Sequence, residues 1–173
     1  ITLVGDVDLN NTLTLNDGTA AVNTQGNALS TTDDTVTVNA GTLTIGAGGS
    51  VDTGAGNLTN SGTIDSSGSI TTTNFTSTGT FTNSAANTIA AAGDVTISGT
   101  FDGTTTDNTL TMSGAFGTTL DETLTTGSLG NVDITGEIEL STDVELDGDF
   151  TIAVGAELYP GILGRDITVG GSW

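Results

Sequence analysis

Carboxylates are the side chains of this sequence with the greatest capacity for chemistry. Of its 173 residues, 21 are Asp or Glu and one is Lys or Arg, with no His and no Cys. Residues two apart on a strand share a face, and Ca²⁺ takes six to eight oxygen ligands. We therefore predict a candidate calcium site or, alternatively, a solvated acidic face that keeps the protein soluble. The candidate residues are Glu137, Glu139, Asp143, Glu145, Asp147 and Asp149.

Catalysis is the function class that the composition argues against most strongly. Without His or Cys, and with Tyr159 and Arg165 the sole Tyr and the sole basic residue, the usual pairs of nucleophile and base cannot be built. Paired carboxylates alone hydrolyse glycosides in some enzymes, so a polysaccharide-active enzyme is the least favoured alternative. Sugar sites usually add aromatic platforms, and the one Trp is Trp173. We predict no catalytic residue, no cofactor other than Ca²⁺, and no enzyme.

The charge balance restricts the partners. A net charge of −20 leaves nothing to neutralise phosphates, which argues against nucleic acid. No stretch approaches the ~18 consecutive apolar residues of a membrane span, so we expect no direct membrane insertion. The absence of Cys means that burial and backbone hydrogen bonds must hold the fold without disulfides.

A short repeat positions these residues. It consists of a Gly followed by a strand with an apolar residue in its middle, and successive glycines are 17 to 21 residues apart. Two further apolar-centred strands recur in each unit. Three strands per coil of 19–20 residues predict an all-β, right-handed parallel β-helix; the alternative is a β-sandwich or barrel. The repeats are at 41–44, 62–65, 79–82, 99–102 and 136–139, with weaker members at 117–120 and 155–158.

The repeat also predicts the core. Leu43, Ile64, Phe81, Phe101 and Ile138 are expected in one internal row, which continues through Leu120 and Leu158. The second row is expected to run through Val51, Ile70, Ile89, Leu110, Leu124 and Val144, and the third through Leu58, Phe75, Val95, Phe116, Val132 and Phe150.

One domain is expected over residues 1–173, as a segment of a longer chain. Residues 1–40 fit the repeat less regularly, and we expect a long corner from Gly18 to Asp34. Neither end carries a charged or amphipathic cap, and uncapped strand edges promote further pairing. The predicted partners are therefore other copies of the chain, assembled end to end or laterally, or surface glycans and proteins.

Threonine pairs suggest a further alternative. Thr42 with Thr44 and Thr80 with Thr82 show the spacing of the flat arrays that order water in ice-binding solenoids. The array is broken at the equivalent Thr63 with Asp65. A binding module for ice, glycan or Ca²⁺ therefore stays an alternative to a structural role, because Thr is also favoured in strands for its shape.

The repeats resemble the β-helices of repetitive bacterial surface proteins, of the filamentous-haemagglutinin and autotransporter-passenger type. The resemblance rests on residues 62–71 (GTIDSSGSIT), 74–83 (NFTSTGTFTN) and 166–173 (DITVGGSW). It implies an extracellular, cell-surface location and a structural role as a fibre subunit, stalk or adhesin shaft. It carries over no catalytic residue.

Overall fold

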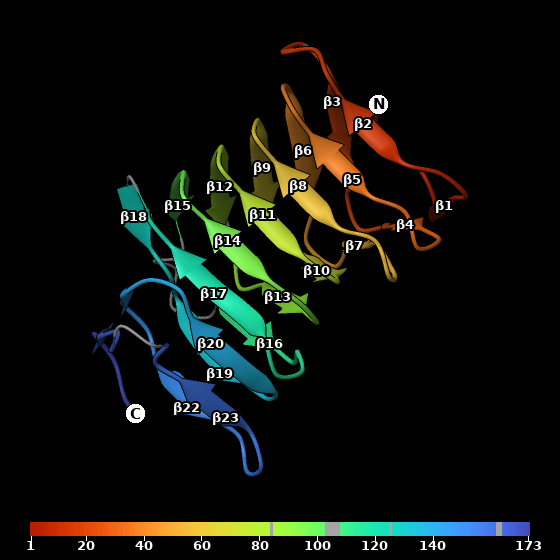
Figure 1. Cartoon of the computed structure of the whole chain (residues 1–173). Coiled ribbons are helices and arrows are strands. Elements are labelled where there is room, and N and C mark those ends of the chain that lie inside the picture. The colour runs from red at the N-terminus through yellow and green to blue at the C-terminus, as the bar shows by residue number, and fades with distance from the viewer. Residues whose placement is uncertain (84, 103–107, 125, 162–163) are drawn as a thin grey trace.

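The chain forms a rod of stacked coils (Figure 1). The computed structural model describes residues 1–83, 85–102, 108–124, 126–161 and 164–173, and these form 24 strands. The strands make a β-solenoid of about seven turns, with three strands and about 21 residues per coil. With one interruption on the third face, strands three places apart along the chain pair in parallel. This pairing confirms the predicted parallel β-helix over the sandwich or barrel, with coils slightly longer than the predicted 19–20 residues.

Three faces run along the rod. The first face contains β1 (Val7–Leu9), β4 (Ala28–Thr31), β7 (Ser50–Asp52), β10 (Ser69–Thr72), β13 (Thr88–Ala91), β16 (Thr109–Met112), β19 (Asn131–Ile134) and β22 (Phe150–Ile152). The second face contains β2 (Leu13–Leu15), β5 (Val36–Val38), β8 (Leu58–Asn60), β11 (Phe75–Ser77), β14 (Val95–Ile97), β17 (Thr118–Glu122), β20 (Glu137–Leu140) and β23 (Glu157–Tyr159).

The third face is less continuous than the other two. It contains β3 (Ala21–Asn23), β6 (Thr42–Ile45), β9 (Thr63–Ser66), β12 (Thr80–Asn83), β15 (Thr100–Asp102) and β18 (Thr126–Ser128). A single bridge between Leu129 and Leu146 follows, and then β21 (Val144–Leu146) pairs with β24 (Ile167–Val169).

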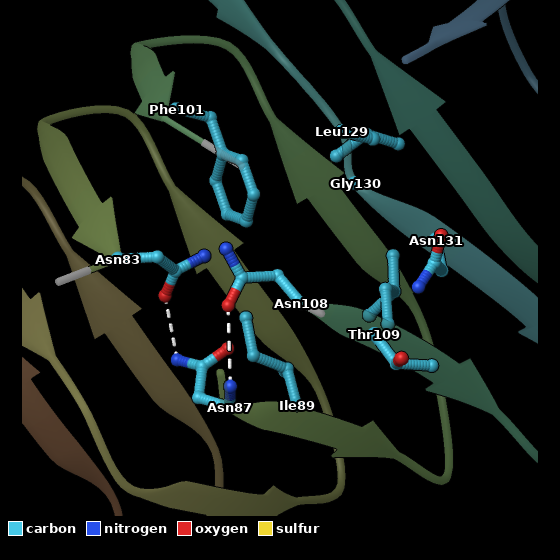
Figure 2. Close-up of a pocket in the computed structure, with 10 residues that line it drawn as sticks. Asn83, Asn87, Ile89, Phe101, Asn108, Thr109, Leu129, Gly130 and Asn131 are labelled. Atoms are coloured by element: carbon cyan, nitrogen blue, oxygen red, sulfur yellow. Dashed lines mark hydrogen bonds between the residues drawn. The ribbon is translucent and has the colours of Figure 1, made fainter. Parts of the chain in front are cut away.

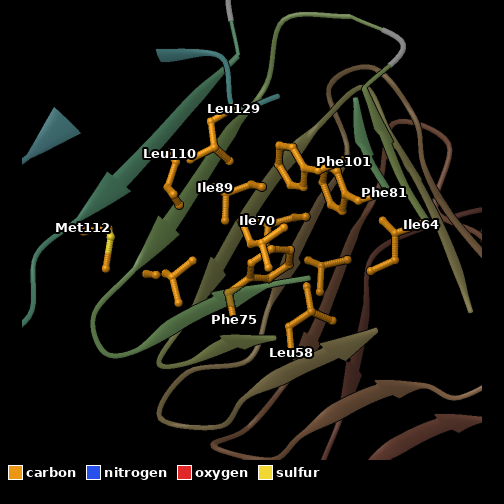
Figure 3. Close-up of a cluster of buried hydrophobic side chains, with 14 of the residues drawn as sticks. Leu58, Ile64, Ile70, Phe75, Phe81, Ile89, Phe101, Leu110, Met112 and Leu129 are labelled. Carbon is orange, nitrogen blue, oxygen red and sulfur yellow. The ribbon is translucent and has the colours of Figure 1, made fainter. Parts of the chain in front are cut away.

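The core is a column of apolar side chains inside the coils (Figure 3). Alternation along each short strand turns one set of residues inward and the next set outward. Leu43, Ile64, Phe81 and Phe101 pair in register on the third face, as predicted. Phe81 stacks on Phe101 with ring centroids 4.8 Å apart, and Phe75 meets Phe81 edge-on at 5.7 Å. These residues and Ile138 are buried, which confirms their prediction as core.

Ile89 and Leu110 pair as predicted on the first face, but the predicted rows are wrong beyond Phe101 on the third face and beyond Leu110 on the first. Phe101 pairs with Gly127, 26 residues further along the chain, so a constant period of 19–20 residues assigns the later strands to the wrong face. Leu120, Ile138 and Leu158 lie on the second face. On the first face, Leu110 pairs with Val132 and Val132 with Phe150, in place of the predicted Leu124 and Val144. Phe116 is 73% exposed and is no core residue.

The N-terminal coils are more regular than predicted. The stretch from Gly18 to Asp34, expected as a long corner, contains β3 and β4. β4 pairs with β1 and β7 on the first face, and β3 pairs with β6 on the third. The Ala, Asn and Ser residues between Gly18 and Asp34 weaken the alternation of apolar and polar residues, so the sequence does not mark these two strands clearly.

Side chains at the corners connect successive coils. An Asp or Asn oxygen in one coil accepts a hydrogen bond from a backbone N–H in the next. Oδ1 of Asp33 accepts from Ala55 at 2.8 Å, and Oδ1 of Asn74 accepts from Asp94 at 2.7 Å. These bonds satisfy backbone donors at positions where the strands have ended.

Candidate functional site

The six carboxylates predicted as a calcium site are distributed around one coil. Glu137 and Glu139 lie on β20 of the second face, and Glu145 lies on β21. Because the chain turns corners between these strands, the spacing of two residues places only Glu137 and Glu139 on the same face of one β-strand. Asp143 and Asp147 lie directly before and after β21, and Asp149 directly precedes β22.

Three of these aspartates make structural hydrogen bonds. Oδ1 of Asp143 accepts from the backbone N–H of Asp166 at 3.1 Å, and Oδ1 of Asp149 accepts from Ser172 at 2.7 Å. Oδ2 of Asp147 accepts from the Ser128 hydroxyl at 2.6 Å. These carboxylates therefore fasten one coil to its neighbours.

Metal binding stays a prediction for this chain. Within the described ranges, no three Asp or Glu side chains are close enough together to hold a metal ion. Any Ca²⁺ bound by the six residues would have to complete its coordination with backbone oxygens and water, which calcium sites also use.

An open groove on the outer surface brings together residues that the sequence left unconnected. Its lining consists of Phe116, Glu139, Tyr159, Pro160 and Gly161, and its volume is about 260 Å³. Glu139 and Tyr159 are neighbours because β20 pairs with β23 in register. Phe116 meets Tyr159 edge-on, with centroids 5.5 Å apart and the rings at 90°. The groove therefore has an aromatic side and a carboxylate.

The electrostatic environment of the groove is strongly negative. The Tyr159 hydroxyl donates a hydrogen bond to Oε2 of Glu157. This bond, followed by desolvation and by the charges of Glu157 and Glu137, raises the pKa of Tyr159 to about 12. The same register places Glu137 directly beside Glu157 on the adjacent strand. Like charges in directly paired positions repel each other.

A buried acid lies at the end of β17, the strand that pairs with β20. Glu122 is 9% exposed; its backbone N–H donates to Oγ1 of Thr142 at 2.7 Å, and its Oε2 accepts from the backbone N–H of Glu145 at 2.9 Å. Burial raises the pKa of Glu122 to about 7, against the lowering effect of the bond from Glu145. The sequence analysis missed this residue, although alternation from an inward Leu120 turns Glu122 inward as well.

A small internal cavity lies at the corner between the third and first faces (Figure 2). It offers about 10 Å³ for the centre of a water molecule, enough for one. Asn83, Asn87 and Asn108 line it together with Phe101 and Leu129. Nδ2 of Asn87 donates to Oδ1 of Asn83 at 2.6 Å, and the backbone N–H of Asn87 donates to Oδ1 of Asn108 at 3.2 Å. The cavity lies where Gly127 replaces an apolar residue above Phe101.

A threonine ladder occupies the outer side of the second face. One Thr from each of five successive strands pairs in register with the next. Strands in such a ladder are ~4.8 Å apart, so the hydroxyl groups form a regular row that ends where Thr96 pairs with Asp121. The members are Thr14, Thr37, Thr59, Thr76 and Thr96.

The fold places the chain among the β-solenoid repeat proteins. A scan against protein-family models found no match, and searches of curated proteins and of solved structures found none either. Within the described ranges, no helix is long and apolar enough to cross a membrane.

Proposed function

We propose that the chain is a structural element of an extracellular protein: a segment of a stalk, fibre or adhesin shaft displayed at a bacterial-type cell surface. We also propose that the chain is of the filamentous-haemagglutinin or autotransporter-passenger type, which its repeats resemble. The proposal assigns no catalytic role and expects no nucleic acid and no inserted membrane as partner. The expected partners are other copies of the chain, or surface glycans and proteins.

The continuity of the first and second faces carries the proposal. Each is an eight-stranded parallel sheet in which every strand belongs to a different coil. Repeat proteins of this kind gain length by adding coils, since each coil contacts mainly its neighbours. Adding strands at ~4.8 Å gives a rod whose length is set by the number of coils. A spacer requires this property.

Duplication of one coil tests the spacer role. Residues 50–68 contain β7, β8 and β9, and residue 69 pairs in register with residue 50. A second copy of 50–68 should lengthen the rod by ~5 Å and leave its melting temperature within a few degrees. Spin-label distances between residues near the two ends would measure the increase. An unchanged distance, or loss of folding, would contradict a modular spacer.

Location and assembly need a separate test. Antibody against the chain should label the outer surface of the source cells in electron micrographs, on fibres or stalks. Purified chain that pairs end to end should form unbranched fibres with strands perpendicular to the fibre axis. Label confined to the cell interior would overturn the proposed location, and strictly monodisperse material would overturn self-assembly.

Ice binding is a second candidate, favoured by the threonine ladder of the second face. The five threonines form one unbroken row, and a flat row of hydroxyl and methyl groups orders water. A similar row lies on the third face, where Thr42, Thr63, Thr80 and Thr100 pair in register. The expected result is measurable thermal hysteresis that is lost in a Thr59→Leu, Thr76→Leu double variant. Absence of hysteresis in the unchanged chain would eliminate this candidate.

A further inference from the structure

The groove beside Tyr159 combines aromatic and acidic groups in a way that the shaft does not require. Phe116 is a large apolar side chain that remains 73% exposed, so its position gains little from burial in the core. It packs edge-on against the ring of Tyr159, and both rings line a groove of about 260 Å³ that Glu139 also lines. An exposed aromatic pair beside a hollow is typical of binding surfaces.

The charges around the groove define the kind of ligand. Glu139 lines it, and Glu137 and Glu157 lie in paired positions at its side. The one basic residue of the chain, Arg165, donates its backbone N–H to the oxygen of Pro160 in the lining, so one positive charge on this segment stands against three glutamates. A cation placed there would relieve the repulsion between paired carboxylates, and cations are attracted to the faces of Tyr and Phe rings.

We propose that this groove binds one cationic side chain, Arg or Lys, of a partner protein. The charged group lies against the rings of Phe116 and Tyr159, and the carboxylate of Glu139 accepts its hydrogen bonds. The hydrogen bond that the Tyr159 hydroxyl donates to Glu157 is the main cause of the raised pKa of Tyr159, and the charges of Glu157 and Glu137 add to it. A neutral sugar could stack on the rings but would leave the repulsion between carboxylates unchanged.

The proposal is independent of the shaft function, since a rod of any role could carry such a groove. The probes are N-acetyl-arginine amide and its neutral counterpart N-acetyl-citrulline amide, added to the whole chain. Tyr159 is the only Tyr of the chain, so its ring resonances in NMR spectra are assigned without ambiguity. The arginine probe should shift the Tyr159 and Phe116 resonances in a saturable way, at least tenfold more tightly than the citrulline probe.

Substitutions locate the binding. Glu139→Gln should weaken arginine binding about tenfold, and Phe116→Ala should remove saturable binding. Glu145→Gln removes the same charge from the third-face side of that coil and should leave binding unchanged. Melting curves and circular dichroism confirm that each variant folds.

Three results would overturn the proposal. Equal binding of the arginine and citrulline probes would show that charge plays no part. Binding that survives Glu139→Gln and Phe116→Ala would place it elsewhere. Saturable binding of a neutral oligosaccharide, without binding of arginine, would make the groove a glycan site instead.

Discussion

The central coils and the C-terminal coils share one architecture but use their inner and outer positions differently. From β6 to β15 the interior is mainly apolar, with a few buried polar groups such as the hydrogen-bonded Thr53 and Thr72, and the second face presents threonines outward. From β17 onward a buried Glu122 enters the interior, Gly127 interrupts the third face, and acidic and aromatic groups replace threonine outside. The comparison indicates that a solenoid can change its chemistry coil by coil while its backbone pairing continues.

The interior of the central coils should be the least tolerant part of the molecule. Phe81→Ala removes a fully buried ring from between Ile64 and Phe101 and should lower the free energy of unfolding by about 3–5 kcal/mol. Urea unfolding followed by circular dichroism measures the loss. Thr82→Ala, on the outward side of the same strand, is the control and should change stability by less than about 0.5 kcal/mol. Similar losses for both would contradict the description of Phe81 as core.

The interruption at Gly127 should be nearly as sensitive, for a backbone reason. Gly127 has φ of +97°, and a Cβ added there would clash with the backbone oxygen of Phe101. Gly127→Ala should therefore cost about 2–3 kcal/mol, from left-handed strain plus a clash with backbone. Gly155→Ala is the matched control: its φ is +87°, but a Cβ would meet no atom within 4 Å.

Strain alone should make Gly155→Ala cost about 1 kcal/mol. The difference between the two variants then measures the close approach of β18 to β15. Equal losses would show that the strands separate easily at this point, and that the third face is weaker here than its pairing indicates.

The same interruption limited what the sequence could predict. Leu43, Ile64, Phe81 and Phe101 were placed correctly because their spacings, 21, 17 and 20 residues, vary little and each is apolar. At the next coil the spacing grows to 26 residues and the position is a Gly, so neither length nor hydropathy marks it. From this coil onward, the predicted rows that continue through Ile138, Val144, Val132 and Phe150 were therefore assigned to the wrong faces.

The groove and the buried acid illustrate two different limits. Glu122 could have been found, since it stands two residues after Leu120 on one strand and must share its face. The pairing of Phe116 with Tyr159 could not, because it depends on how β17, β20 and β23 align across two coils. The six acidic residues of 137–149 were predicted as a group. The chain turns between β20, β21 and β22 were not predicted, and these turns distribute the six residues around the rod.

Glu122 should make the C-terminal coils sensitive to pH. Its pKa in the folded protein, about 7, lies above the usual 4.5, so folding favours its protonated form. The contribution of Glu122 to the free energy of unfolding should be complete below about pH 4.5, where the residue is protonated in both the folded and the unfolded protein. This contribution should be lost as the pH rises to about 7, and Glu122 should cause no further change above that pH. A difference of this size between the two pKa values corresponds to an effect of roughly 1–3 kcal/mol.

Glu122→Gln tests this by keeping a neutral side chain of the same size. The variant should equal the unchanged protein near pH 4 and exceed its stability at pH 8, measured as urea midpoints across that range. Glu139→Gln removes a charge from the outer surface and should leave the pH dependence between 4.5 and 7 largely intact. If both variants flattened it equally, general repulsion between carboxylates would be the cause, not the burial of Glu122.

Phe116→Ala should have the smallest effect on stability, although it removes as many atoms as Phe81→Ala. Phe116 is 73% exposed and its main aromatic contact is Tyr159, so the loss should stay below about 1 kcal/mol. Urea unfolding alongside Phe81→Ala measures the contrast directly. A loss approaching that of Phe81→Ala would make Phe116 part of the structural core. A small loss would show that folding does not depend on the exposed ring, which leaves the ring free to act in a binding groove.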